Sequence, residues 1–368
     1  MSFSPEFPYN DLPDLPPSSE IETKAVLRKV APARAALAAL AESLSHLPNA
    51  EIITNSIILQ EAKDSSEIEN IITTHDELFK AMVMQSKLFE STATKEVLRY
   101  REALRVGFES LRDRGVINTP LIDRINMELL NHNAGIRRTP GTKLLNDRTK
   151  EVVYTPPEGR SILEAKLDRL WEYLHEKVPD SLDPLIKLAL LHYQFEAIHP
   201  YSDGNGRTGR ILNVLYLVQE NLLPLPVLYM SGYIIRTKPQ YYEFLRAVTV
   251  EGRWEQWVLY MLHAVEETAN STRQLVAKIR DLRKEFDQAI KSRAPHIKQI
   301  HEITEILFMQ PYSRIEFFVE AGIGSRMTVS KYLKVLEELQ LVSPHRVSRN
   351  TIYINQPLFK LLSGHKIG

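Results

Sequence analysis

The chain has 368 residues, which suggests two to three domains at ~150 residues per domain. Its 46 Lys and Arg residues balance 46 Asp and Glu residues, so it lacks the net charge expected of a protein that coats nucleic acid or an anionic membrane. It contains no cysteine, which excludes disulfides, thiol catalysis and cysteine-ligated metal centres.

The first 17 residues hold five of the 21 prolines, which predicts an extended arm rather than a helix or a strand. These residues also lack the basic and apolar regions of a signal peptide. Because no later apolar stretch is long enough to cross a bilayer, we expect a cytoplasmic protein without a membrane segment.

Helices are predicted next, because apolar residues recur at three- and four-residue spacing over 31–42, 56–85, 94–113 and 119–132. The pattern then changes to a weak alternation over 142–146 and 151–155, on either side of a polar turn. This change predicts a β-hairpin.

Helical patterns return over 162–178. Asp183 followed by Pro184 predicts a helix start, since aspartate caps a helix and proline suits its first position. Pro200 is expected to end that helix. Further helices are expected at 204–218 and 238–248, and more up to about residue 290.

The last part of the chain, 292–368, has the pattern of a winged-helix domain. It combines helical segments, predicted at 298–308, 313–321 and 325–340, with a short strand pair, predicted at 341–342 and 351–355. Ten basic against six acidic residues give this part a charge of +4. The cations of the third helix and the wing could contact DNA phosphates, or the domain could dock a protein partner; they are Arg326, Lys331, Lys334, Arg346 and Arg349.

The segment HPYSDGNGRTGR, residues 199–210, is the most informative in the chain. Its glycines lie where a loop enters a helix, and such a helix start binds phosphates through backbone N–H groups. Arg207 and Arg210 share one face of that helix, where two cations are favourable only beside an anion. Asp203 suits Mg²⁺ held together with phosphate oxygens, and His199 suits a general base.

A metal hydrolase is a second interpretation of this region. His192, Glu196 and His199 fall at spacings of four and three residues on one predicted helix, which would give a metal-binding face. That interpretation leaves the glycines and the two arginines of the loop unexplained.

The segment resembles the signature of the Fic family, HPFx(D/E)GNGRxxR, with Tyr201 in place of the usual Phe. The resemblance extends over about residues 100–260. It implies a protein adenylyltransferase that moves AMP from ATP to a Ser, Thr or Tyr hydroxyl of a target protein or of itself. A nucleotide-sensing, DNA-binding transcription regulator built on a Fic core is the alternative.

The resemblance also implies roles for individual residues. His199 would deprotonate the target hydroxyl, and Asp203 would hold Mg²⁺ on the α- and β-phosphates. The nucleotide would be bound by Gly204, Asn205, Gly206, Arg207, Thr208, Gly209 and Arg210, with Tyr242, next to Tyr241, on the adenine side. The hairpin 142–155 would correspond to the family's flap, along which a target segment adds as a further strand.

Ser65-xxx-Glu69-Asn70 resembles the inhibitory motif (S/T)xxxE(G/N) of the same family. The resemblance implies that Glu69 pairs with Arg210 and so blocks the position of the γ-phosphate. Some relatives use this glutamate to direct water for removing AMP, so a reverse activity is a further option.

Taken together, these patterns predict a mainly α protein, with a helical Fic core, a small β-hairpin flap and a C-terminal winged-helix domain. The expected divisions are 1–95 for an N-terminal helical region with the inhibitory motif, 96–290 for the catalytic core and 291–368 for the winged helix. ATP and Mg²⁺ are the expected ligands. The target protein, a DNA or protein partner at the winged helix and a second copy of the chain are the candidate partners.

Overall fold

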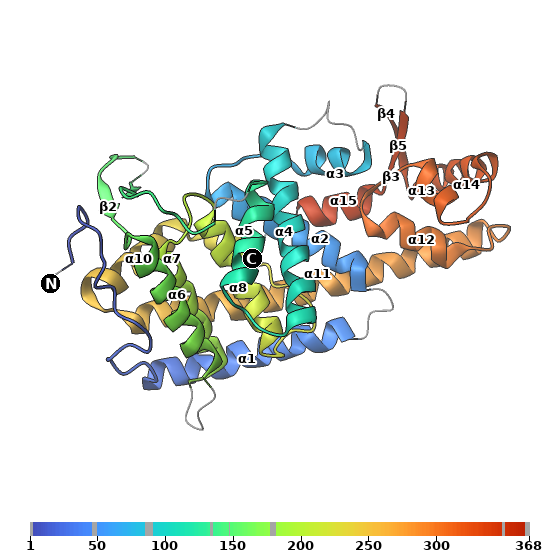
Figure 1. Ribbon diagram of the computed structural model, residues 1–368. Coiled ribbons are helices and arrows are strands. Elements are labelled where there is room, and N and C mark those ends of the chain that lie inside the picture. The colour runs from blue at the N-terminus through green and yellow to red at the C-terminus, as the bar shows by residue number, and fades with distance from the viewer. Residues whose placement is uncertain are drawn as a thin grey trace.

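The computed structural model of the protein describes residues 3–45, 50–84, 91–132, 135–146, 148–176, 182–347 and 350–364. Helices dominate this elongated molecule, and its strands form two small antiparallel sheets (Figure 1). The mainly α fold predicted from the sequence is therefore confirmed. Within these ranges, no helix combines the length and the apolar character that crossing a bilayer requires.

The first half of the chain contains α1 (Lys24–Ser45), α2 (Ala50–Ile68), α3 (His75–Met84), α4 (Thr92–Arg114), α5 (Thr119–Leu130), β1 (Leu144–Leu145), β2 (Val152–Tyr154) and α6 (Arg160–His175). The central part contains α7 (Pro184–Ile198), α8 (Asn205–Gln219), α9 (Met230–Arg236), α10 (Lys238–Glu251) and α11 (Trp254–Arg293). The C-terminal part contains α12 (Ile300–Met309), β3 (Tyr312–Ser313), α13 (Ile315–Glu320), α14 (Arg326–Glu338), β4 (Ser343–Val347), β5 (Asn350–Ile354) and α15 (Gln356–Ser363).

Helix α7 is buried along nearly its whole length and positions the motif loop. Its apolar character on all sides is that of a helix surrounded by other elements. As predicted, Asp183 caps its start, with Oδ1 accepting a hydrogen bond from the Leu185 N–H at 2.8 Å, and Pro184 is its first residue. At the other end, His199 adopts a left-handed backbone with φ of 50° and turns the chain into the loop.

The prediction of one helix over 56–85 is wrong, because the chain breaks between α2 and α3. Asn70 adopts a φ of 63°, in the left-handed region that commonly ends helices. The Ile71 N–H then donates to the Ser66 carbonyl at 3.0 Å, which closes the turn. The break places Glu69 at the C-terminal end of α2, a helix that lies between α4 and α9.

The region after residue 254 differs from the expected series of helices. A single helix, α11, spans 40 residues without a glycine or a proline, and α1 packs along it. Figure 1 shows α11 running from the core to the C-terminal part.

The C-terminal part has a three-stranded sheet in the order β3–β5–β4. Strands β4 and β5 pair from Ser343–Ile354 to Val347–Asn350, so most of the segment between the two predicted strands is itself strand. The strand predicted at 341–342 is wrong in position, and neither β3 nor α15 was predicted. A strand of two residues such as β3 is too short to give an alternating pattern.

This C-terminal part packs on helices α2 and α3. The Gln60 side-chain amide donates to the Leu362 carbonyl, and the Tyr312 hydroxyl donates to Asp76 Oδ1 at 2.6 Å. The Phe79 ring lies 5.6 Å from the Tyr312 ring and 6.0 Å from the Phe359 ring, between centroids. Gln60 precedes the turn that carries Glu69, and Asp76 and Phe79 follow it. The contacts therefore hold the chain on both sides of that turn.

Candidate active site

The loop between α7 and α8 is held in shape by its own side chains and by α5. Asn205 Oδ1 accepts from the Tyr201 N–H at 2.8 Å, and Asn205 Nδ2 donates to the Tyr201 carbonyl at 2.8 Å. Asn126 of α5 donates to the Asp203 carbonyl at 3.1 Å. The Asn205 side chain, expected to contact phosphate, is therefore committed to the loop.

The first turn of α8 forms an anion site. Gly204 is the N-cap with a φ of 74°, and it provides no side-chain hydrogen bond to the free N–H groups that follow. Those N–H groups and the helix dipole favour a bound negative charge. A Cβ on Gly206 would lie 2.4 Å from Glu69 Oε1, so the Glu69 carboxylate rests directly against this turn. Only glycine allows that approach.

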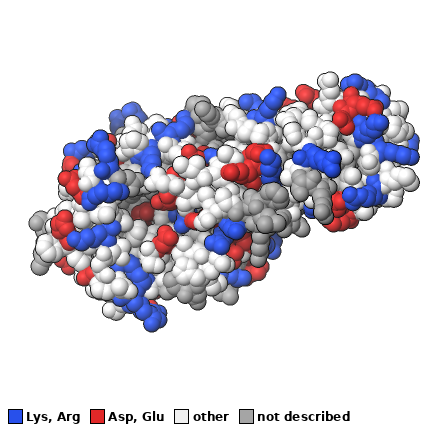
Figure 2. Space-filling model, turned by 90° about the horizontal axis from the view of Figure 1, so that it is seen from above, with Lys and Arg blue, Asp and Glu red and all other residues white. Residues whose placement is uncertain are grey.

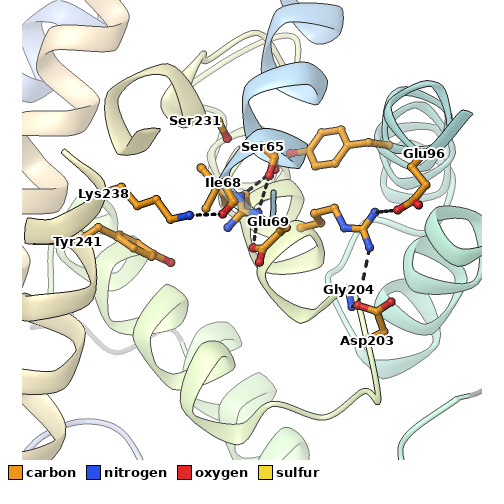
Figure 3. Close-up of polar contacts among 12 residues, drawn as sticks. Ser65, Ile68, Glu69, Glu96, Asp203, Gly204, Ser231, Lys238 and Tyr241 are labelled. Carbon is orange, nitrogen blue, oxygen red and sulfur yellow. Dashed lines mark hydrogen bonds and ion pairs between the residues drawn. The ribbon is translucent and has the colours of Figure 1, made fainter. Parts of the chain in front are cut away.

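Arg210 joins the loop to α2 through Ser65 and Glu69, which Figure 3 labels. Its Nη2 donates to Glu69 Oε1 at 2.8 Å and to the Ser65 carbonyl at 2.9 Å, while its Nε donates to Ser65 Oγ at 2.8 Å. The Arg210 side chain is 1% exposed. The structure thus brings Ser65, Glu69 and Arg210 together from segments about 140 residues apart.

The charges of this pair are stable near neutral pH. Burial alone would raise the pKa of the Glu69 carboxyl, but Arg210 outweighs burial and holds that pKa below its ordinary value of 4.5. For Arg210, burial disfavours the charged form, yet Glu69 keeps its pKa above the ordinary value. The contact is therefore an ion pair throughout the neutral range and is not opened by a small change in pH.

Two further buried carboxyls lie near Arg210. Burial raises the pKa of Glu196 to about 7, against the opposing field of Arg210. Burial also raises the pKa of Glu61 to about 7, although Ser231 donates to it from its backbone N–H at 2.9 Å and from its hydroxyl. A Cβ on Gly209 would lie 2.6 Å from Glu196 Oε1, so this glycine also permits a close approach.

Arg207, the other arginine of the motif, points away from Arg210 towards α4. Its Nη1 donates to Glu96 Oε2 at 3.1 Å, and its Nη2 lies 3.8 Å from Asp203 Oδ1 (Figure 3). The Asp203 side chain is 72% exposed and also accepts from the Gly204 N–H at 2.6 Å. Asp203 therefore presents a carboxylate to solvent beside the anion site.

His199 lies at the end of α7 in the neutral form. Burial, and then the nearby Arg137, lower its pKa to about 4, so its imidazole is neutral at neutral pH, which is the form that can accept a proton. Arg137 also donates from Nε to the His199 carbonyl at 2.8 Å and from Nη2 to the Pro157 carbonyl. Arg137 therefore fixes the left-handed backbone of His199 and ties it to the end of the β1–β2 hairpin.

His192 and Glu196 do not form a metal centre with His199. His192 Nε2 bonds the Tyr241 hydroxyl at 2.8 Å, and its Nδ1 lies 3.0 Å from Asn213 Nδ2. Burial lowers the pKa of His192 to about 3. Among the described residues, no group of three His, Asp or Glu side chains is arranged to hold a metal ion.

The remaining predicted site residues, Thr208 and Tyr242, lie at the margin of the site. The Thr208 side chain is buried, and its hydroxyl lies 3.3 Å from Asn126 Nδ2. Tyr241 is buried, whereas Tyr242 is 46% exposed, with the Lys238 Nζ 6.0 Å from its ring centroid. Lys238 also donates to the Ile68 carbonyl at 2.6 Å and so caps the end of α2 (Figure 3).

Sequence reasoning missed Glu96, Arg137 and Lys238. Each acts on a motif residue from a separate element: Glu96 on Arg207, Arg137 on His199, and Lys238 on the carbonyl next to Glu69. No local spacing links these pairs, which lie 62 to 170 residues apart. Arg137 lies five residues after the helix predicted at 119–132, and no pattern in the sequence marks it.

The left-handed conformation of Asn70 gives a first prediction. Replacing Asn70 with valine is expected to lower the free energy of unfolding by about 1–2 kcal/mol, because a β-branched residue is strained at positive φ. Asn70→Gly should be tolerated. Urea unfolding of both variants tests this, and equal stability of the valine and glycine proteins would contradict it.

Three family models match consecutive stretches that together make up most of the chain. "Fic/DOC family N-terminal" matches residues 27–109, "Fic/DOC family" matches 117–217, and "Protein adenylyltransferase SoFic-like, C-terminal domain" matches 282–358. The second stretch contains the motif loop, and the first contains α2 with Glu69.

Relatives of known name match part of the chain. A "Protein adenylyltransferase Fic" of Drosophila willistoni is 27% identical over 154 residues, which are 40% of this chain and 30% of the relative. Its counterpart in Drosophila grimshawi is 31% identical over 112 residues, which are 30% of this chain and 22% of the relative. The match thus spans less than a third of either relative.

Solved structures share the fold over a greater length. A Fic family protein from Desulfovibrio desulfuricans G20 superposes with a TM-score of 0.59 at 20% identity, covering 92% of this chain and 98% of that one. Fic-1 from C. elegans superposes with a TM-score of 0.53 at 18% identity, covering 70% and 74%. These likenesses show that the fold is shared. The three matching family models and the motif loop show that the chain belongs to the Fic/DOC family.

Proposed function

We propose that the protein is an adenylyltransferase that moves AMP from ATP to a hydroxyl of a target protein. The observation that carries this proposal is the first turn of α8, an uncapped anion site flanked by Arg207 and Arg210 and preceded by a neutral His199. Names of the matched relatives support it. The alternative of a regulator that only senses nucleotide would need neither a poised base nor an exposed Asp203.

In this proposal the target hydroxyl attacks the α-phosphorus, and His199 accepts its proton. A new P–O bond forms to the target oxygen while the bond to pyrophosphate breaks, so the products are the AMP-modified target and pyrophosphate. The N–H groups of α8 and the two arginines stabilise the charge that develops on the phosphates. These groups are held in position before the reaction begins. Their fixed geometry lowers the activation free energy of AMP transfer.

The residues present fit a magnesium ion shared with phosphates. Asp203 offers an exposed carboxylate beside the anion site, and Mg²⁺ typically takes one or two carboxylates together with phosphate oxygens. When bound there, the ion would neutralise phosphate charge and orient the leaving group.

Glu69 is proposed to inhibit the reaction. Its carboxylate lies against Gly206 and on Arg210, which is where the phosphates are expected to bind. ATP would then have to displace an ion pair between the buried Arg210 and the partly exposed Glu69 before it could bind productively. Lys238, which caps α2, and the packing of Gln60 on the C-terminal part both hold this helix in place.

Two labelled forms of ATP test the reaction class. With the label on the α-phosphate, the protein is expected to become labelled; with the label on the γ-phosphate, it is expected to stay unlabelled. Label from the γ-phosphate alone would instead indicate phosphoryl transfer.

Arg137 gives a second prediction. Arg137→Met is expected to lower the rate of AMP transfer about 10- to 100-fold, because it removes the bonds that orient His199 and the hairpin. ATP binding should be unchanged. Arg112→Met, at an exposed site on α4, is the control and should keep the rate of the native protein. A normal rate in the Arg137 variant would contradict this positioning role.

The winged-helix part is a candidate DNA-binding site within this proposal. The outer face of α14 exposes Arg326, Lys331 and Lys334, and the wing exposes Arg346, whereas Arg349 lies outside the described residues. Arg326 is paired with Glu316 at 2.6 Å, which reduces its availability. A mobility shift with random duplex DNA that weakens with salt would support this partner, and no shift at low salt would exclude it.

A further inference from the structure

Glu196, on α7 three residues before His199, carries a carboxyl group that the proposed reaction does not use. Its Oε1 is buried and has no hydrogen-bond partner among the described residues. That atom rests against α8, since a Cβ on Gly209 would lie 2.6 Å from it. A buried polar atom without a partner costs free energy, and this one lies beside Arg210, the next residue of α8.

The groups that face Glu196 come from three other helices and from α7 itself. Arg210 of α8 favours its charged form, whereas Glu69 of α2 disfavours that form. Tyr241 of α10 and His192 of α7 are neutral near pH 7, because burial raises the pKa of Tyr241 and lowers that of His192 to about 3. The charges of Arg210 and Glu69 therefore determine whether Glu196 holds a proton.

Charges have to balance locally at this position. On the face seen in Figure 2, acidic and basic side chains are interspersed and open to water. Arg210 is only 1% exposed, so water and salt screen its charge far less. Glu69 already neutralises it at 2.8 Å, and an ionised Glu196 would add an uncompensated negative charge. Glu196 is therefore expected to hold a proton while Glu69 is in place, in agreement with its pKa of about 7.

Departure of Glu69 reverses this balance. Among the described residues, Glu69 is the one carboxylate paired with Arg210, so its departure leaves a buried cation without a counter-charge in direct contact. Glu196 then no longer feels the negative charge of Glu69, and Arg210 lowers its pKa so that it loses the proton. Phosphates that bind Arg210 bring negative charge back, which returns a proton to Glu196.

Glu196 lies against Gly209, whereas the Glu69 carboxylate lies against the first turn of α8. Glu196 can thus ionise without covering the turn where phosphates are expected. We propose that Glu196 is a positioning residue that supplies the counter-charge of Arg210 when neither Glu69 nor nucleotide is bound there, and that it takes up a proton from solvent when phosphates bind. This inference rests on the proposed binding of ATP at α8 and adds a proton-linked step to it.

Calorimetric titration of the full-length Glu69→Gly protein tests the inference. The ligand is the magnesium complex of α,β-methylene ATP, an analogue that cannot donate AMP. Titrations at pH 7 in buffers of different ionisation enthalpy give the number of protons taken up on binding. We expect roughly half a proton to one proton. Because the complex holds the proton more tightly than the empty site, affinity should fall about three- to tenfold per pH unit as the pH rises.

Three comparisons assign the proton to Glu196. The native protein should take up much less, because phosphates there only replace the charge of Glu69. Adding Glu196→Gln to the Glu69→Gly protein should remove the excess uptake and flatten the pH dependence of affinity. Adding Glu285→Gln instead, at an exposed site on α11, is the matched control and should keep both. Protonation of the analogue itself contributes to every titration, so the differences between proteins are the measure.

Equal uptake in the native and Glu69→Gly proteins would overturn the inference, and this comparison stands even if the Glu196→Gln variant does not fold. Undiminished uptake in the Glu196→Gln variant would also overturn it. So would uptake that is lost with Glu61→Gln but kept with Glu196→Gln, because the proton would then belong to the other buried carboxyl near Arg210. If the analogue did not bind the Glu69→Gly protein at all, the proposed nucleotide site would be contradicted instead.

Discussion

Glu69→Gly is expected to raise the incorporation of AMP into the protein by about 10- to 100-fold, a range typical of the coupling between two competing ligands. The carboxylate of Glu69 occupies the first turn of α8 and binds the buried Arg210. Its removal frees the N–H groups for phosphates and takes away the charged partner of the guanidinium, which keeps its hydrogen bonds to Ser65. The measurement is the rate of labelling by α-labelled ATP.

The control for this change is Glu67→Gly, two residues away on the same helix. Glu67 pairs with Lys63 at 2.7 Å on the side of α2 away from Arg210, so its removal weakens the helix without opening the anion site. It should label at the native rate. If both glycine variants rose equally, loosening of α2 rather than the Glu69 carboxylate would explain the effect, and the inhibitory role would be wrong.

His199→Ala is expected to lower AMP transfer by about 10²- to 10⁴-fold in the Glu69→Gly background, the range typical of a lost general base. The neutral imidazole at the end of α7 is the proposed proton acceptor, and Arg137 fixes its left-handed backbone. ATP should still bind, since the anion site belongs to α8. Single-turnover labelling and a separate binding measurement distinguish the two effects.

The matched control is His263→Ala, at an exposed position on α11. It removes an imidazole of the same size without touching the loop, so labelling should stay at the level of the Glu69→Gly protein. Unchanged labelling in the His199 variant would show that His199 is not the general base. If the variant lost both ATP binding and labelling, the result would show instead that His199 shapes the nucleotide site.

The parts of the fold that could be predicted depend on local chemistry. The start of α7 follows from Asp183 and Pro184, whose effects are confined to one helix turn. The motif loop follows from glycines and charges within twelve residues. In both cases the residues that determine the structure are neighbours in the sequence, which is why the pattern alone was informative.

The parts that could not be predicted depend on contacts between distant segments. The apolar spacing of 56–85 continues through residue 70, and only the left-handed backbone of Asn70 shows the break. Arg137 and Lys238 bind backbone carbonyls, which carry no sequence signal at all. Their roles appear only once the tertiary fold places them beside His199 and Glu69.

The central claim is that this protein transfers AMP through His199 and is held back by Glu69. Intact-protein mass spectrometry after addition of ATP and magnesium tests it directly on three chains: the native protein, Glu69→Gly, and Glu69→Gly/His199→Ala. A gain of one adenylyl group is expected on the Glu69→Gly protein, little gain on the native protein and none on the double variant. No gain on Glu69→Gly, or an equal gain on the double variant, would contradict it.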